Sequence, residues 1–491
     1  MTKTLAIGLD SADKSLILEW ARDGSLPTFR RLLELGAWGT TWNPPGLYAG
    51  SVWPSFFTGA SPARHGRYSD HRFIPGTYET TEFRPSDIAA RPFWEVLSDN
   101  NKRVAVIDVP TAPVSRDLNG IHVVDWGTHD PEEGLMTCPP ALAKTLESAY
   151  GPDPVGQCDY GGRGPGDFPR FRDGLIRRIE EKTSYCRELL AEEDWDLFLV
   201  VFTECHCVGH QCWHLHDPDH PRHDAALAQA TGDPVKDVYV ATDRAIGLLL
   251  ETAGSETPVI LFSSLGMGPY RSAGPALDTI LQKMEHSTTV RSRVHALLFR
   301  LWKQLPMNLR KHLNGVKKQI RNSLLSPDRA GRKCFALPAN GAIRINLVDR
   351  EPKGLIGPGP EYEAFCESLS RDLLAIKDAD TGTQLIRRVH RTDDFFARST
   401  SDSLPDLLVE WNTDTLITSI ESEKIGHLDI AQETNRTGDH VPEGMLVVVR
   451  PGIRPGRLQR PIPVVDVAPT LAAYLGVSLE DIDGVPIQEL L

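Results

Sequence analysis

Short apolar runs of strand length alternate along this chain with longer segments of helical periodicity. The runs typical of strands are Leu5 to Leu9, Arg103 to Asp108, Leu197 to Phe202, Pro258 to Ser263, Asp406 to Trp411 and Met445 to Val449. The segments typical of helices include Leu16 to Leu35, Phe171 to Glu192, Val238 to Glu251 and Tyr362 to Ile376. This alternation favours an α/β fold with a mostly parallel sheet covered by helices on both faces. With 491 residues, the chain is long enough for one large domain or two.

Polar residues directly follow three of the predicted strands. Asp10 ends the first strand, the segment from Glu204 to His210 follows Phe202, and residues 263 to 268 follow a third strand. In parallel α/β sheets, ligands bind in the crevice at the carboxyl ends of the strands. We therefore expect these three strand ends to line one crevice.

Two histidines in the sequence LFLVVFTECHCVGHQCWH, residues 197 to 214, have the spacing of metal ligands. If a helix begins in this segment, His206 and His210 lie on one of its faces, where two imidazoles can bind a single ion. Such a pair needs a third ligand from elsewhere in the chain. The alternative is that both are polar histidines in a loop after a buried strand.

The cysteines and the N-terminal residues indicate the cellular compartment in which we expect the protein. Eight cysteines in 491 residues are no disulfide framework, and Cys205, Cys207 and Cys212 lie among the histidines, so we expect reduced thiols or metal ligands there. The first residues, MTKTLAIGLD, lack the features of a signal peptide, and we find no apolar stretch of membrane-spanning length. These observations predict a cytoplasmic protein without a transmembrane segment.

The charge is unevenly distributed. The chain has a net charge of −13, yet residues 281 to 334 contain thirteen Lys or Arg against only Glu285 and Asp328. Within them, residues 294 to 305 have the periodicity of an amphipathic basic helix. This helix is either a solvated helix packed on the core, a lid that attracts an anionic substrate, or a patch that contacts a membrane or a partner.

Six segments, in this order, resemble the alkaline phosphatase superfamily, in particular its type I phosphodiesterase and nucleotide pyrophosphatase branch. They are IGLD ending at Asp10, WPSFFTGASPARHG at 53 to 66, the strand with His206 and His210, SSLGMG at 263 to 268, TGDHVPEG at 437 to 444 and VVDVAPTLAAYLGV at 464 to 477. The resemblance implies an alkaline-phosphatase-like α/β core formed by residues 1 to 270 and 336 to 491. Residues 271 to 335 would be a basic helical insertion, acting as a lid or cap.

The resemblance also implies a metal site at the strand ends. His206, His210 and His440 would bind a divalent metal, where relatives more often have Asp, His and His. Zinc is the expected ion, with manganese or iron as alternatives, because each is bound by imidazole-rich sites. A cation there would meet the charge that develops on a phosphoryl group during its transfer.

The second metal position and the nucleophile position of the family differ in this chain. Asp10 is kept, but the family's Asp-His pair falls on Ser264 and Leu265, and leucine cannot bind a metal. We therefore expect one ion rather than two, with Asp10 either binding a weak second ion or polarising a water. The nucleophile position falls on Ala49, so Ser51 is the candidate substitute, unless it is a helix N-cap.

Five further residues are candidates for the crevice. Glu204 is a candidate general base or orienter of an imidazole, or else the partner of an Arg or Lys. Asp70 and His71 lie near the position where relatives bind the phosphate. The alternative is that both are ordinary polar residues exposed to solvent. His129, with Asp125 before it, follows a short β-rich run and is a weaker candidate.

The expected function is metal-dependent hydrolysis of a small anionic phosphate ester, a phosphodiester or a nucleotide-like pyrophosphate. A nucleic acid polymer is not an expected partner, and the sequence does not indicate an oligomeric state. Two alternatives stay open: an inactive binding protein on a phosphatase fold with a structural metal, or a hydrolase of a sulfate ester or phosphonate, since a cationic site accepts any tetrahedral anion.

Overall fold

The computed structural model describes residues 3–44, 48–129, 131–158, 163–285, 328–337, 341–396, 404–430 and 434–491. Its largest element is a central sheet with the strand order β20-β2-β19-β9-β1-β8-β5-β6-β7, in which β21 also pairs with β2. The strands are β1 Leu5–Leu9, β2 Ala37–Trp42, β5 Val104–Ile107, β6 Gly120–Val124, β7 Met136–Cys138, β8 Leu197–Phe202, β9 Val259–Ser263, β19 Gly444–Val449, β20 Gly456–Arg457 and β21 Ile462–Pro463. The five central strands β9, β1, β8, β5 and β6 are parallel, while β19 and β7 are antiparallel to their neighbours.

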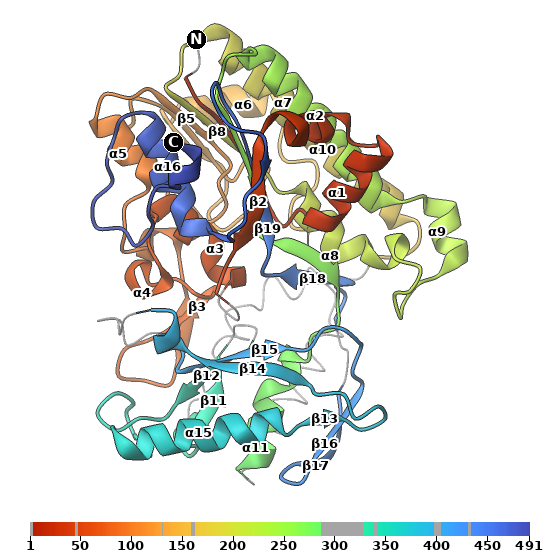
Figure 1. The fold of residues 1–491 in the computed structure, drawn as a ribbon, viewed down its shortest axis with the longest axis vertical. Helices are drawn as coiled ribbons and strands as arrows, with labels where there is room; N and C mark the ends of the chain where they lie inside the picture. The colour runs from red at the N-terminus through yellow and green to blue at the C-terminus, as the bar shows by residue number, and fades with distance from the viewer. Residues whose placement is uncertain are drawn as a thin grey trace.

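Helices cover both faces of this sheet, which is why β1, β8 and β9 are buried along their whole length and, apart from Ser263, apolar. One face packs against α1 Lys14–Asp23, α2 Pro27–Leu35, α7 Asp167–Glu192 and α10 Pro234–Ala253. The other packs against α3 Tyr48–Thr58, α5 Phe93–Asp99 and α16 Val467–Tyr474. Figure 1 shows α5 and α16 on the left of the sheet and α1, α2 and α10 on its right. The predicted fold class is confirmed.

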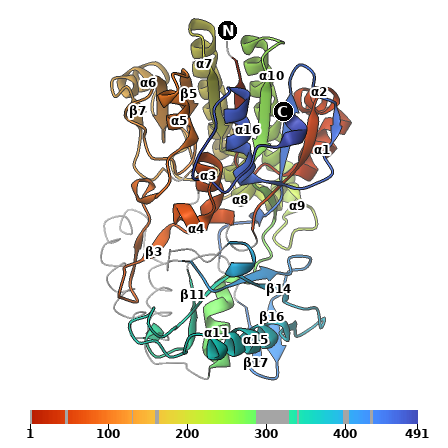
Figure 2. The ribbon, with the colours of Figure 1, turned by 60° about the vertical axis from the view of Figure 1, so that its left-hand side comes forward.

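A smaller lobe has a hydrophobic core of its own, built from residues between Ala273 and Ile430. Its antiparallel sheet has the order β11-β12-β15-β14, and α11 and α15 pack in the same core. These elements are β11 Cys334–Ala336, β12 Ala342–Ile345, β14 Ile386–Arg391, β15 Leu407–Trp411, α11 Leu277–Met284 and α15 Pro360–Leu374. Figure 2 shows the lobe below the central sheet. Most of the described residues between Ala336 and Ile430 thus pack in this lobe, whereas residues 336 to 491 were expected in the main core.

The run from Asp406 to Trp411 illustrates why the sequence does not reveal which sheet a strand joins. Its apolar pattern resembles that of the central strands, but β15 buries its side chains within the small lobe. The pattern of one strand does not specify which sheet it joins.

The predicted basic helix at residues 294 to 305 lies outside the described residues.

A disulfide joins Cys158 to Cys207, whose Cα atoms are 5.6 Å apart. The expectation of a reduced or metal-binding thiol is therefore wrong for Cys207, while Cys205 and Cys212 are free and buried. The two bridged residues are 49 positions apart, and only the packing of the loop before α7 against α8 (Glu204–His216) brings them together. Within the described ranges, no helix has the length and apolar character of a membrane span.

Candidate metal site

The two histidines with the spacing of metal ligands lie on a helix that begins where a buried strand ends. β8 ends at Phe202, and α8 starts at Glu204, with Thr203 as its N-cap residue. His206 and His210 are one turn apart on this helix, with 4% and 0% of their surface exposed. Both imidazoles therefore lie at the carboxyl end of the central sheet, shielded from bulk solvent.

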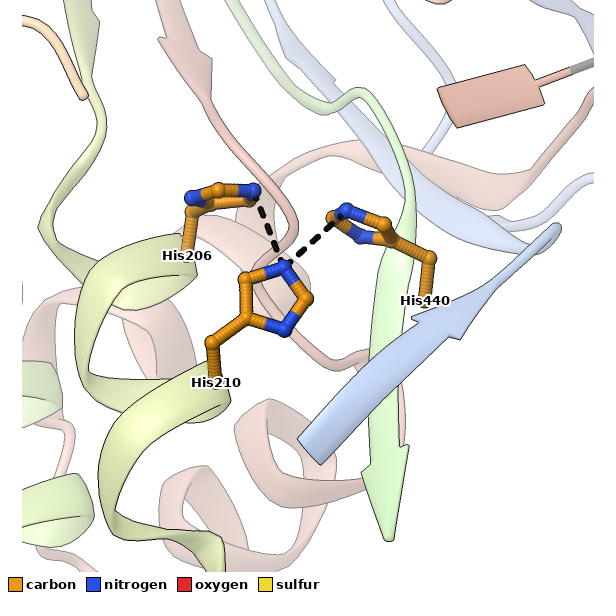
Figure 3. A group of neighbouring side chains, drawn as sticks. All are labelled: His206, His210 and His440. Carbon is orange, nitrogen blue, oxygen red and sulfur yellow. Dashed lines mark hydrogen bonds between the residues drawn. The ribbon is translucent and has the colours of Figure 1, made fainter. Parts of the chain in front are cut away.

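The third histidine comes from a distant part of the chain. His440 lies on β18 (Gly438–Val441), which pairs antiparallel with β10 (Gly266–Pro269) so that Met267 is opposite His440. The Nε2 atom of His210 is 3.2 Å from Nε2 of His206 and 3.2 Å from Nε2 of His440. Figure 3 shows the three rings converging from α8 and β18.

The protonation state of His206 and His210 leaves their imidazoles able to bind a cation. His210 Nδ1 donates a hydrogen bond of 2.8 Å to the carbonyl oxygen of Gly438, so its Nε2 carries a free lone pair. Burial lowers the pKa of both His206 and His210 well below the ordinary value, which keeps the imidazoles neutral. Tetrahedral bonds of about 2.0 to 2.1 Å to zinc place two nitrogens about 3.3 Å apart. The observed spacing of 3.2 Å fits such an ion.

Asp10 follows β1 directly and is 2% exposed. Its Oδ1 atom accepts hydrogen bonds from Trp53 Nε1 at 3.0 Å and from Ser264 Oγ at 2.9 Å. Burial by itself raises the pKa of this carboxyl, but the neighbouring His206 and His129 lower it, and the resulting pKa is below its usual range. Asp10 is therefore an ionised carboxylate at the edge of the histidine cluster.

Of the residues at this site, His129 had the weakest signal in the sequence. It lies in the loop after β6, and its Nε2 atom is 2.9 Å from Oδ2 of Asp10. Its ring stacks on that of His206, with ring centroids 3.8 Å apart. Asp10, His129 and His206 form a second group of donor atoms within 4.8 Å of one another. The only sequence signal was a histidine shortly after a strand-like run.

Glu204 forms a buried ion pair. Its Oε1 atom accepts a hydrogen bond of 2.8 Å from Arg178 Nε and lies 3.9 Å from Lys182 Nζ, and all three side chains are fully buried. A buried carboxylate needs such a partner because the isolated charge would be strongly disfavoured. Of the two interpretations of Glu204, the structure shows the ion pair.

Ser51 lies inside α3, which begins at Tyr48, so it is not the N-cap of that helix. It is 2% exposed and lines a cavity of about 290 Å³ with Phe395 and Phe396. One turn further on, Ser55 Oγ is 3.0 Å from Nε2 of His65.

The Ser55 and His65 pair has the wrong polarity for activating a serine. The backbone N–H of Arg67 donates to His65 Nδ1 at 3.1 Å, so the ring proton is on Nε2 and is donated to Ser55. This imidazole therefore cannot accept the proton of Ser55.

Asp70 and His71 lie at the start of a small hairpin formed by β3 (His71–Phe73) and β4 (Thr80–Glu82). The Nδ1 atom of His71 is 3.1 Å from Oδ1 of Asp70, whose side chain is 71% exposed. The two residues thus pair with each other on a surface hairpin. Their expected role in binding the phosphate remains a prediction.

The fold and the donor cluster define the class of protein. Helices lie on both sides of a mostly parallel sheet, with imidazoles and a carboxylate at the strand ends, which is the arrangement of an alkaline-phosphatase-like fold. Among solved structures, the chain is similar to phosphonoacetate hydrolase from Sinorhizobium meliloti 1021, crystallised with phosphonoformate, with 14% identity over 97% of this chain and 96% of that one and a TM-score of 0.53. It is also similar to human ectonucleotide pyrophosphatase/phosphodiesterase 5, with 12% identity over 100% of both chains and a TM-score of 0.51. At such identities, these likenesses show the fold alone.

Residues 4–442 match the model of the type I phosphodiesterase / nucleotide pyrophosphatase family. The chain belongs to this family, and the resemblance found in the sequence is confirmed. No curated protein matches it.

Proposed function

We propose that this chain is a metal-dependent hydrolase of a phosphodiester or nucleotide-like pyrophosphate, with its cation bound by His206, His210 and His440. The observation that supports the proposal most is the convergence of the Nε2 atoms of His206 and His440 on that of His210, each at 3.2 Å, from two distant segments. When bound, the cation would supply the positive charge that stabilises a phosphoryl group in its transition state. Zinc is the proposed ion because all three ligands are imidazoles.

The surrounding residues fix this arrangement. Gly438 holds the tautomer of His210, and Ser11 Oγ connects the two parts of the site, 3.3 Å from Asp10 Oδ1 and 3.1 Å from His440 Nδ1. Position 49 is an alanine, which has no attacking atom. We therefore propose direct attack by water rather than a covalent intermediate on a serine, with Asp10 as the ionised group of the site.

The test combines metal analysis with turnover of bis-p-nitrophenyl phosphate. The purified protein should contain metal and release p-nitrophenol, and His210→Ala should lose bound metal and lower turnover roughly a hundredfold or more. His216→Ala is a matched control on the same helix, because His216 pairs with Asp233 at 2.7 Å instead of facing the cluster. Metal that stays bound without turnover of any phosphate, sulfate or phosphonate ester would favour the inactive binding protein. Metal-free protein would contradict the proposal.

A further inference from the structure

The loop after α8 returns to the segment that carries His440. This loop, residues 217–224, connects α8 to α9 (Ala225–Thr231), and His220 lies in it with only 4% of its surface exposed. The Nε2 atom of His220 is 3.0 Å from the carbonyl oxygen of Thr437, the residue just before β18. The helix that carries two histidines of the site is therefore joined, through the loop that follows it, to the strand that carries the third.

Hydrogen bonds at both ring nitrogens fix the tautomer of His220. The backbone N–H of Arg222 donates to Nδ1 at 3.0 Å, so the ring proton is on Nε2 and is donated to Thr437. The carbonyl oxygen of Thr437 also accepts the backbone N–H of Tyr270, at 2.8 Å. A carbonyl oxygen has two lone pairs, and both are used here. His220 thus supplies one of the two donors that hold this carbonyl group.

Thr437 transmits this contact to the metal site. Its backbone N–H donates to the carbonyl oxygen of His210 at 2.6 Å, and its hydroxyl oxygen is 3.2 Å from the same atom. The carbonyl oxygen of the next residue, Gly438, accepts the Nδ1–H of His210 at 2.8 Å. Two adjacent residues before His440 therefore bond both the main chain and the ring of His210.

The strand approaches the helix so closely that only glycine fits. A Cβ atom on Gly438 would lie 2.3 Å from the carbonyl oxygen of Gly209, and one on Gly209 would lie 2.7 Å from Cγ of Met267. Such a contact between two main chains has no interlocking side chains. The position of the strand along α8 therefore depends on the hydrogen bonds around it.

Arg222 adds two bonds to the same segment. Its guanidinium donates to the carbonyl oxygen of Thr434 at 2.9 Å and to that of Arg436. These bonds are exposed, so water competes with them, whereas the bond from His220 is buried. The buried bond is the stronger constraint on the segment that leads into β18.

We infer that His220 is a positioning residue for the proposed cation site; this inference rests on the proposed function. By donating to Thr437, His220 holds β18 against α8 and keeps His440 beside the two histidines of the helix. It acts through the main chain and is not itself one of the three ligands. Without its bond, the carbonyl group of Thr437 has one donor instead of two, and a less firmly held His440 binds zinc more weakly.

The experiment measures the zinc affinity of the full-length protein by competition with a chromophoric chelator. His220→Phe keeps a ring without a donor, and His220→Asn keeps a polar group that is too short to reach Thr437. Each should weaken zinc binding about tenfold or more. His220→Gln places an amide N–H where Nε2 lies and should keep the affinity within about threefold of the unmodified protein.

The matched control is His223→Phe, in the same loop. His223 donates to the carbonyl oxygen of His214 at 2.8 Å instead of Thr437, so this variant should keep the zinc affinity. Thermal unfolding of each metal-free variant shows that the affinity is measured on folded protein, and the pair His220→Asn and His220→Gln gives the test should the phenylalanine variant not fold.

The other outcomes separate this inference from the proposed function. Unchanged zinc affinity in His220→Asn overturns the inference and leaves the three-histidine site intact. An equal loss of affinity in His220→Gln, or in His223→Phe, overturns it as well. If the unmodified protein binds no zinc, both the proposed function and the inference are overturned.

Discussion

Arg178 on α7 donates a hydrogen bond of 2.8 Å to Glu204 on α8, and neither side chain has any exposed surface. Because Arg178 also bonds the Thr128 carbonyl, it contacts both segments that bring histidines to the site. The pair is thus a structural device at the base of the site rather than part of its chemistry.

Removing this guanidinium should destabilise the chain. We expect Arg178→Met to lower the free energy of unfolding by about 3 to 5 kcal/mol, because it leaves Glu204 charged and buried. Urea denaturation measures the change. The neighbouring Arg177 is the matched control: it pairs with Glu181 at 2.7 Å but is 64% exposed, so Arg177→Met should cost about 0 to 1 kcal/mol. Equal losses for the two variants would contradict the assigned role.

Ser51→Ala should leave turnover of bis-p-nitrophenyl phosphate within about twofold of the unmodified protein, because Ser51 lines a cavity inside α3 and water is the proposed nucleophile. The release of p-nitrophenol under single-turnover conditions measures the chemical step. A fall of a hundredfold, with metal content unchanged, would show that Ser51 is the nucleophile after all.

The stability of the chain should fall in acid because of buried neutral histidines. Burial lowers the pKa of His65 to about 3, from 6.5 in the unfolded chain. The stabilisation is therefore complete above pH 6.5 and is lost as the pH falls toward 3, by about 1.4 kcal/mol per pH unit for this one group. His65→Asn keeps an acceptor for the Arg67 N–H and should reduce the slope of unfolding free energy between pH 6 and 4 by about one proton. An unchanged slope would mean that His65 is protonated in the folded chain.

The disulfide can be counted directly. Six cysteines are free and two are bridged, so thiol titration of the denatured, unreduced protein should find six reactive groups, and eight after reduction. Since the bridge closes a loop with a sequence separation of 49, its reduction should lower the unfolding free energy by about 2 to 4 kcal/mol. Eight thiols before reduction would exclude the bridge in the protein as purified.

Zinc removal should affect both stability and activity. A chelator should lower the melting temperature, because an ion that binds only the folded state stabilises it by mass action. Turnover should disappear with the metal and return when zinc is added back to the full-length chain. A melting temperature unaffected by chelator and zinc would indicate that the histidine cluster binds no ion.

The sequence alone determined the features that depend on neighbours in the chain. The alternation of strands and helices predicted the α/β core, and the spacing of four residues put His206 and His210 on one face, because helical geometry repeats every 3.6 residues. His440 was found only through the family resemblance, since no local pattern connects it to a histidine 230 positions away.

Tertiary structure decided the contacts that depend on how segments pack. It gave Glu204 a buried arginine, bridged Cys207, assigned the strand at Leu407–Trp411 to the smaller lobe and brought His129 to Asp10. The physical reason is the same in each case. A side chain's partner is set by the order of strands in the sheet and by the side on which each connection crosses, and periodicity along the chain carries neither of these.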